Sequence, residues 1–268
     1  MSDTRADFVS RLVSRARPPG LDAETSAVDL FRAYCAVPRD GALFERNLSD
    51  VLELLLQQHG FDLAAADAAY IEQAYSVFRD FGTQTTYGSR PTVTDVEEVP
   101  PRDVGSPCDA IRVRAPFYRE GLQATYADFM TVTDDDGMPW SYLAAEERYQ
   151  FVRDLQIRNL IVPLTGDFGG AVTLRAVAAY LGAREAAVGM FYASNVEQYL
   201  WIGGDQNPNG GAAAFYENVG ALPRYPAAVF VRSGSGAVNQ FVSPIDETLE
   251  AVADGRIRRY ADILGLYR

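Results

Sequence analysis

Polar residues follow three apolar runs in the second half of the chain, as the pairs Gly166-Asp167, Ser194-Asn195 and Arg232-Ser233. The carboxylate of Asp167 can accept hydrogen bonds from a ribose or an amine, or hold a metal, and the amide of Asn195 can both donate and accept. Ligands bind beyond the carboxyl ends of the strands in open parallel sheets. We therefore predict a ligand-binding rim made of Gly166, Asp167, Phe168, Tyr192, Ser194, Asn195, Glu197 and Ser233.

A structural interpretation of the same residues stays open. Asp and Asn are common helix caps, and both Asp167 and Asn195 precede predicted helices. Gly169 and Gly170 either admit a ligand or allow a helix to pack closely on a strand.

The basic residues exclude several reaction classes. All 24 are arginines, and His59 is the single histidine. A phosphate-binding P-loop, a Schiff base and familiar kinase chemistry each need a lysine. His59 ends an apolar helical pattern just before Gly60, which predicts a structural role at the C-terminus of a helix.

The two cysteines, Cys35 and Cys108, predict no disulfide framework and have no metal-ligand spacing to His59. We expect ordinary thiols in a reducing cytoplasm and no metal site. The net charge of −12 disfavours nucleic acid and anionic membranes as partners. No apolar stretch reaches the length of a membrane span.

The elements that would position the rim follow from periodicity. Periodicity predicts helices over residues 1–80 and an irregular loop region over residues 81–124. Over residues 125–268 it predicts strands that alternate with helices. The expected strands are 160–164, 187–192 and 227–231. The expected helices are 27–37, 43–58, 63–80, 144–156, 171–181, 196–201, 210–219, 246–253 and 256–264. This alternation predicts a single α/β domain over 1–268 with a Rossmann-like parallel sheet and a helical N-terminal portion.

Three motifs carry a family resemblance: Ser141 to Glu147, Asn159 to Gly170, and Phe191 to Leu200. With Phe215 to Val219 and Leu222-Pro223, they resemble a family of uncharacterised bacterial proteins that is similar in fold to class I S-adenosylmethionine-dependent methyltransferases. The resemblance covers mainly residues 125–233, with a weaker match over 5–87. It implies a methyltransferase-like fold and a nucleotide-like ligand.

This sequence differs from the family pattern in one way: longer family members carry an additional segment at the front of the chain. That segment has a glycine-rich turn and an acidic residue, which hold the methionine part and the ribose of the cofactor in methyltransferases. Nothing before Arg5 supplies either, so we expect an α/β fold that is incomplete at its N-terminus and S-adenosylmethionine binding to be doubtful in the chain as written. The exposed apolar edge of such a sheet favours a homo-oligomer or another partner.

Three functions remain as expectations. The first is binding of a nucleotide-like small molecule without established catalysis. The second is an active methyltransferase, if the true start of the protein lies upstream. The third is a non-enzymatic interaction or scaffold protein, with residues 82–107 and the helical front as its contact surface.

Overall fold

The computed structural model describes residues 2–86, 88–89, 124–202, 211–233 and 240–267. Contacts divide the chain into a first unit, Met1–Ile161, and a second unit, Val162–Arg268. Each unit has a buried apolar core of its own. The single domain expected from the sequence stays a prediction.

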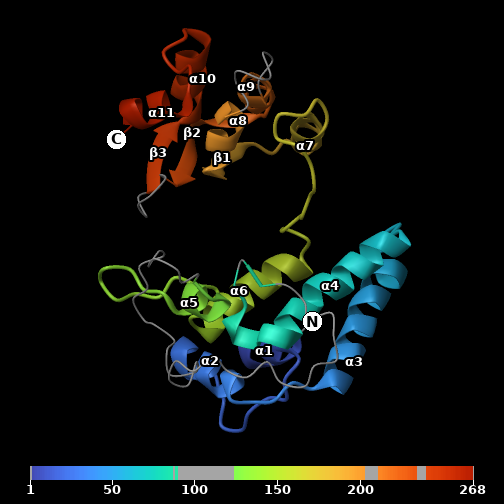
Figure 1. Cartoon of the computed structure of the whole chain (residues 1–268). Helices are drawn as coiled ribbons and strands as arrows, with labels where there is room; N and C mark the ends of the chain where they lie inside the picture. The colour runs from blue at the N-terminus through green and yellow to red at the C-terminus, as the bar shows by residue number, and fades with distance from the viewer. Residues whose placement is uncertain (1, 87, 90–123, 203–210, 234–239, 268) are drawn as a thin grey trace. The chain divides into compact units, whose positions relative to one another are not determined.

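The first unit is helical in its described part (Figure 1), as the sequence predicts for residues 1–80. Several of its helices start at side chains that accept hydrogen bonds from backbone N–H groups, because the N–H groups of the first turn have no carbonyl partners within the helix. Thr4 caps α1 in this way, Ser26 caps α2 and Asp40 caps α3. The helices are α1 (Arg5–Val13), α2 (Ala27–Cys35), α3 (Gly41–Glu53), α4 (Ala65–Phe81), α5 (Tyr126–Thr131) and α6 (Glu146–Ile157).

Helices α1, α2, α5 and α6 bury the core of the first unit. Val9 and Val13 of α1 and Phe31 of α2 are fully buried there. The Tyr34 hydroxyl donates a 2.6 Å hydrogen bond to the carbonyl oxygen of Ala6, which joins α2 to α1. Burial raises the pKa of Tyr34 to about 12, so its hydroxyl stays a neutral donor at neutral pH.

Helix α3 ends in a π-helical turn over Leu54–Gln58, in which the N–H of His59 donates to the Leu54 carbonyl at 3.0 Å. Gly60 follows with a φ of +63°, a conformation that glycine adopts without a steric penalty. The predicted end of this helix at His59 and Gly60 is confirmed, although its last turn is π-helical and not α-helical. Helix α4 then returns alongside α3 to form a hairpin (Figure 1).

Cys35, the last residue of α2, is disulfide-bonded. The expectation of an ordinary thiol is therefore wrong for this residue; the chain's other cysteine, Cys108, lies outside the described residues. We predict that iodoacetamide does not label Cys35 in folded protein purified without reductant, and that it labels the residue fully after reduction. Peptide mapping by mass spectrometry checks this, and labelling before reduction would contradict the bond.

The second unit contains a three-stranded mixed sheet in the order β1-β2-β3. Strand β1 (Val188–Ser194) pairs in parallel with β2 (Arg224–Ser233), which pairs antiparallel with β3 (Gln240–Pro244). The predicted Rossmann-like parallel sheet is therefore wrong, because the described strands contain a single parallel pair. Around the sheet lie α7 (Thr173–Gly182), α8 (Val196–Ile202), α9 (Gly211–Gly220), α10 (Ile245–Ala253) and α11 (Tyr260–Tyr267).

The apolar run 160–164 explains much of this error. It forms no strand, and Leu160, Val162 and Leu164 are exposed. An apolar run of this length shows that residues favour burial, but it does not show which edge they pair with. The two other expected strands, 187–192 and 227–231, are confirmed as β1 and β2.

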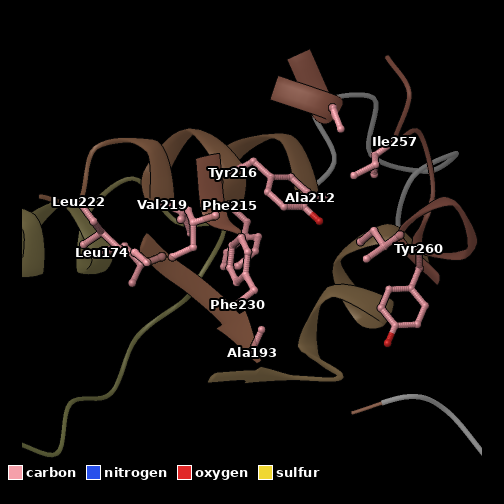
Figure 2. Packing of buried hydrophobic residues seen from close by; sticks show 14 residues of the cluster. Leu174, Ala193, Ala212, Phe215, Tyr216, Val219, Leu222, Phe230, Ile257 and Tyr260 are labelled. Carbon is pink, nitrogen blue, oxygen red and sulfur yellow. The ribbon is translucent and has the colours of Figure 1, made fainter. Parts of the chain in front are cut away.

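The buried core of the second unit combines aliphatic side chains with the aromatic residues Phe215, Tyr216, Phe230 and Tyr260 (Figure 2). Phe215 of α9 and Phe230 of β2 are fully buried, with ring centroids 6.3 Å apart. Phe191 of β1 contacts both rings edge-on, at 5.7 and 5.6 Å. These contacts attach α9 to one face of the parallel pair, whereas Met190 and Tyr192 of β1 are exposed, as expected for alternation along a strand.

Candidate functional site

The structure brings together two of the predicted rim residues, Tyr192 and Ser233. Their hydroxyl oxygens lie 3.2 Å apart at the carboxyl ends of β1 and β2. Ser194, which ends β1, has a φ of +49°, a left-handed conformation that is uncommon for serine. The next residue, Asn195, accepts a hydrogen bond at its carbonyl from the N–H of Gln198 as α8 begins. This end of the parallel pair therefore presents hydroxyl groups and a strained turn.

The loop after residue 166 packs on α9. Asp167 is exposed and accepts a 2.9 Å hydrogen bond from the N–H of Gly169, so its carboxylate stabilises its own turn. Asn218 of α9 donates to the carbonyl oxygens of Phe168 and Gly170, at 3.1 and 2.8 Å. Among the described residues, no hydrogen bond or ion pair joins the side chain of Asp167 to Tyr192 or Ser233.

Two glycines and one aromatic residue of this loop have packing roles. A Cβ atom at Gly169 would lie 2.9 Å from the carbonyl oxygen of Gly211, and a Cβ atom at Gly166 would overlap the side chain of Thr173. The Phe168 ring lies 6.2 Å from the rings of Phe191 and Phe215. These contacts explain the residue types in this loop without a ligand.

Glu197, another predicted ligand residue, lies in a buried ion pair. Glu197 and Arg232 both have 0% exposed side chains. The Nε of Arg232 donates to one carboxylate oxygen of Glu197, and a second guanidinium nitrogen donates to the other at 3.1 Å. Such two-point pairing fixes both position and orientation. Glu197 is therefore not presented to solvent.

The buried pair extends into a polar network. The Tyr216 hydroxyl donates to Glu197 at 2.6 Å, and Arg232 also donates to Ser243 of β3. Burial, together with the charge of Glu197, raises the pKa of Tyr216 far above its usual value, which keeps the hydroxyl protonated. The network thus connects α8, α9 and the sheet, and all its members are satisfied by one another.

A cleft of about 730 Å³ lies within the first unit, between α1, the α3–π-turn segment and α6. Its size falls in the range of roughly 300–1,000 Å³ that is typical of small-molecule sites. Apolar side chains form much of the wall: Phe8, Leu12, Val51, Leu54 and Val152. The ring of Phe8 contacts Tyr142 at 6.0 Å and Tyr149 at 5.7 Å, which extends the aromatic surface.

An ion pair lies on the α1 and α3 side of this cleft. The guanidinium of Arg11 is half exposed and lies 3.7 Å from the carboxylate of Asp50, a weak surface pair. A smaller hollow of about 420 Å³ adjoins the cleft and shares Arg11, Asn47 and Asp50 with it. Arg46 also lines that hollow. Arginine in such a position can bind a carboxylate or a phosphate with two hydrogen bonds.

Hydrogen bonds to residues 2 and 3 hold the α6 side of the cleft. Tyr149 and Arg153 each donate to the carbonyl oxygen of Ser2 at 2.9 Å, and Arg153 also pairs with Asp3 at 3.1 Å. Burial raises the pKa values of Tyr142 and Tyr149, so both remain neutral hydroxyl groups. The wall is therefore ordered before any ligand arrives.

The π-helical turn supplies Leu54 and Gln58 to the opposite wall. Such turns are rare, and they occur often at functional sites. Sequence reasoning missed this cleft, because its residues come from four segments far apart in the chain. The run Leu54-Leu55-Leu56 was a usable signal, since three consecutive leucines exceed one apolar helical face.

Neither a metal site nor a membrane span is found in the described part of the chain. No group of three acidic, histidine or cysteine side chains is arranged to hold an ion there. Of the helices in these residues, none is both long and apolar enough to cross a bilayer.

A comparison with models of protein families gives a match. Residues 109–253, more than half of the chain, match the model of a family described as a domain of unknown function, DUF7790. A search of curated proteins finds no match. The matched residues include β1, β2, α8 and α9, and with them the buried pair of Glu197 and Arg232. The chain therefore belongs to the DUF7790 family.

Proposed function

We propose that this protein binds a small organic anion with a ring or a short apolar body, and that the cleft of the first unit holds it. Nucleotide-like molecules have this chemistry, which agrees with the ligand class expected from the sequence. The observation that carries the proposal is an ordered apolar cleft of about 730 Å³ with Arg11 at its side. The proposal concerns binding and includes no catalytic step.

The two parts of such a ligand have separate partners. A ring or an apolar chain would pack against Phe8, Leu12 and Leu54, where contact with water is lost on binding. An anionic group would pair with Arg11 and displace the weak contact to Asp50. The strand ends of the second unit are less favourable, because Glu197 is buried and Asp167 is engaged in its own turn.

Titration calorimetry with ATP, NAD, S-adenosylmethionine and S-adenosylhomocysteine tests the proposal. We expect at least one of these probes to bind with a dissociation constant near the micromolar range. The substitution Val51→Trp fills the cleft from an exposed position on α3 and should weaken that binding by about tenfold or more. Val172→Trp adds the same bulk at an exposed position of the second unit and should leave it unchanged.

A second pair of variants tests the anion contact. Arg11→Gln should weaken binding, whereas Arg32→Gln should not, although Arg32 makes an equally exposed 3.7 Å pair with Asp29. Absence of heat for all four probes with folded protein would reject a nucleotide-like ligand. If Asp167→Ala and Asn195→Ala abolish binding while Val51→Trp does not, the site lies at the strand ends.

A further inference from the structure

The outer half of the α3–α4 hairpin carries apolar side chains that stay exposed among the described residues of the first unit. Residues 54–72, here named the hairpin tip, are all described, and none of them is buried. Leu56 is 41% exposed, Phe61 55% and Tyr70 71%. These three side chains do not line the cleft. Several exposed large apolar side chains within one short segment commonly mark an interaction surface.

The base of the hairpin is, by contrast, well fixed. Phe44 of α3 stacks on Tyr75 of α4 with ring centroids 4.9 Å apart, and the guanidinium of Arg79 lies 4.5 Å from the Phe44 ring centre. The amide of Asn47 donates to the Tyr75 hydroxyl at 3.1 Å. Helices gain most of their stability from packing of an apolar face, and here only the base has it. Packing thus fixes the base of the hairpin and leaves the side chains of the tip open.

The sequence around the hairpin tip is negatively charged. No lysine or arginine occurs between Arg46 and Arg79. The same stretch contains five acidic residues, which are Asp50, Glu53, Asp62, Asp67 and Glu72. A second copy of the tip would place acidic residues against acidic residues, which disfavours self-association. Nucleic acid and anionic membranes are disfavoured for the same reason.

We infer that the hairpin tip is a docking surface for a basic amphipathic helix of a partner protein. The apolar face of such a helix would cover Leu56, Phe61 and Tyr70. Its lysines and arginines would pair with Asp62 and Glu72, which lie in a stretch without lysine or arginine. An amphipathic helix laid on an apolar helical surface is a recurring mode of recognition. This inference does not depend on the ligand proposed for the cleft.

Fluorescence anisotropy with three labelled peptides tests the inference on the full chain. The first is an amphipathic leucine–lysine helix of about 18 residues. The second replaces lysine with glutamate, and the third scrambles the first so that its apolar face is lost. We expect the leucine–lysine peptide to bind, with an affinity that falls as salt rises, and the other two peptides to bind at least about tenfold more weakly.

Matched variants separate docking from general attraction to an acidic protein. We expect binding of the leucine–lysine peptide to weaken by about tenfold or more in the triple serine variant, Leu56→Ser/Phe61→Ser/Tyr70→Ser. The control variant Phe151→Ser/Val172→Ser changes exposed positions elsewhere and should leave that binding unchanged. Asp62→Asn/Glu72→Gln should reduce both the affinity and its salt dependence. Asp135→Asn/Asp136→Asn removes the same charge from an exposed turn and should change neither.

Several outcomes would overturn the inference. Equal affinity for the wild type and the triple serine variant would show that the tip is not the contact surface. Equal binding of the glutamate peptide would remove the charge argument. A dimer in sedimentation experiments that the triple serine variant abolishes would make a second copy the occupant. Circular dichroism checks that each variant keeps its helices. If the triple serine variant unfolds, the charge variants still test whether the peptide binds at the tip.

Discussion

Glu197→Ala is expected to lower the free energy of unfolding of the second unit by about 3–5 kcal/mol. The substitution leaves the guanidinium of Arg232 buried without its carboxylate, and the Tyr216 hydroxyl loses its acceptor. Desolvation of an unpaired charge is the source of this cost. Denaturant unfolding followed by fluorescence of Trp201, in a Trp140→Phe background, measures it, since these are the two tryptophans of the chain.

Two comparisons support the interpretation of that measurement. Asp254→Ala breaks the exposed pair with Arg256 and should change stability very little. Glu197→Leu/Arg232→Met removes both charges together and should recover much of the loss, because no unpaired charge remains. A small effect of Glu197→Ala would mean that water or another group reaches Arg232, and Glu197 would return as a candidate ligand residue.

The sequence predicts local structure in this protein better than it predicts pairing. Helices α7 to α10 and strands β1 and β2 follow from apolar periodicity, because each depends on residues close in the chain. The exposed run 160–164 and the antiparallel strand β3 depend on distant partners, which periodicity does not specify. The parallel sheet was predicted by counting 160–164 as a third parallel strand, and it fails with that strand.

The candidate site shows the same limit. Sequence reasoning placed polar residues at strand ends, and Tyr192 and Ser233 do meet there. It did not distinguish an acid that faces solvent from one that neutralises a buried arginine, since Arg232 is 35 residues away from Glu197. The cleft was missed because it forms only when α1, α3 and α6 pack together. Residue types suggest chemistry, but packing decides which groups a ligand can reach.

Arg5→Leu is the second large effect, and we expect a loss of about 3–5 kcal/mol in the stability of the first unit. Arg5 is 1% exposed, and its guanidinium donates to the carbonyl oxygens of Leu143 at 3.0 Å and of Ala144 and Ala23 at 3.1 Å, and also to that of Thr25. Glu146 pairs with it at 3.5 Å. Hydrogen exchange of the α1 amides, together with denaturant unfolding, measures the loss.

The charge of Arg5 alone does not account for this role. Burial lowers the pKa of Arg5 and the carboxylate of Glu146 opposes that change, so the guanidinium is held mainly by its carbonyl partners. Arg5→Lys keeps the charge but cannot reach several carbonyls at once, and it should give an intermediate loss. Arg32→Leu, at an exposed pair, should leave the stability almost unchanged.

Arg5 holds the residues that lead into α6, and α6 lines the cleft. Arg5→Leu should therefore also weaken the binding of any ligand in the cleft, whereas Glu197→Ala should not. Equal effects of the two substitutions on ligand binding would place the ligand outside the cleft of the first unit.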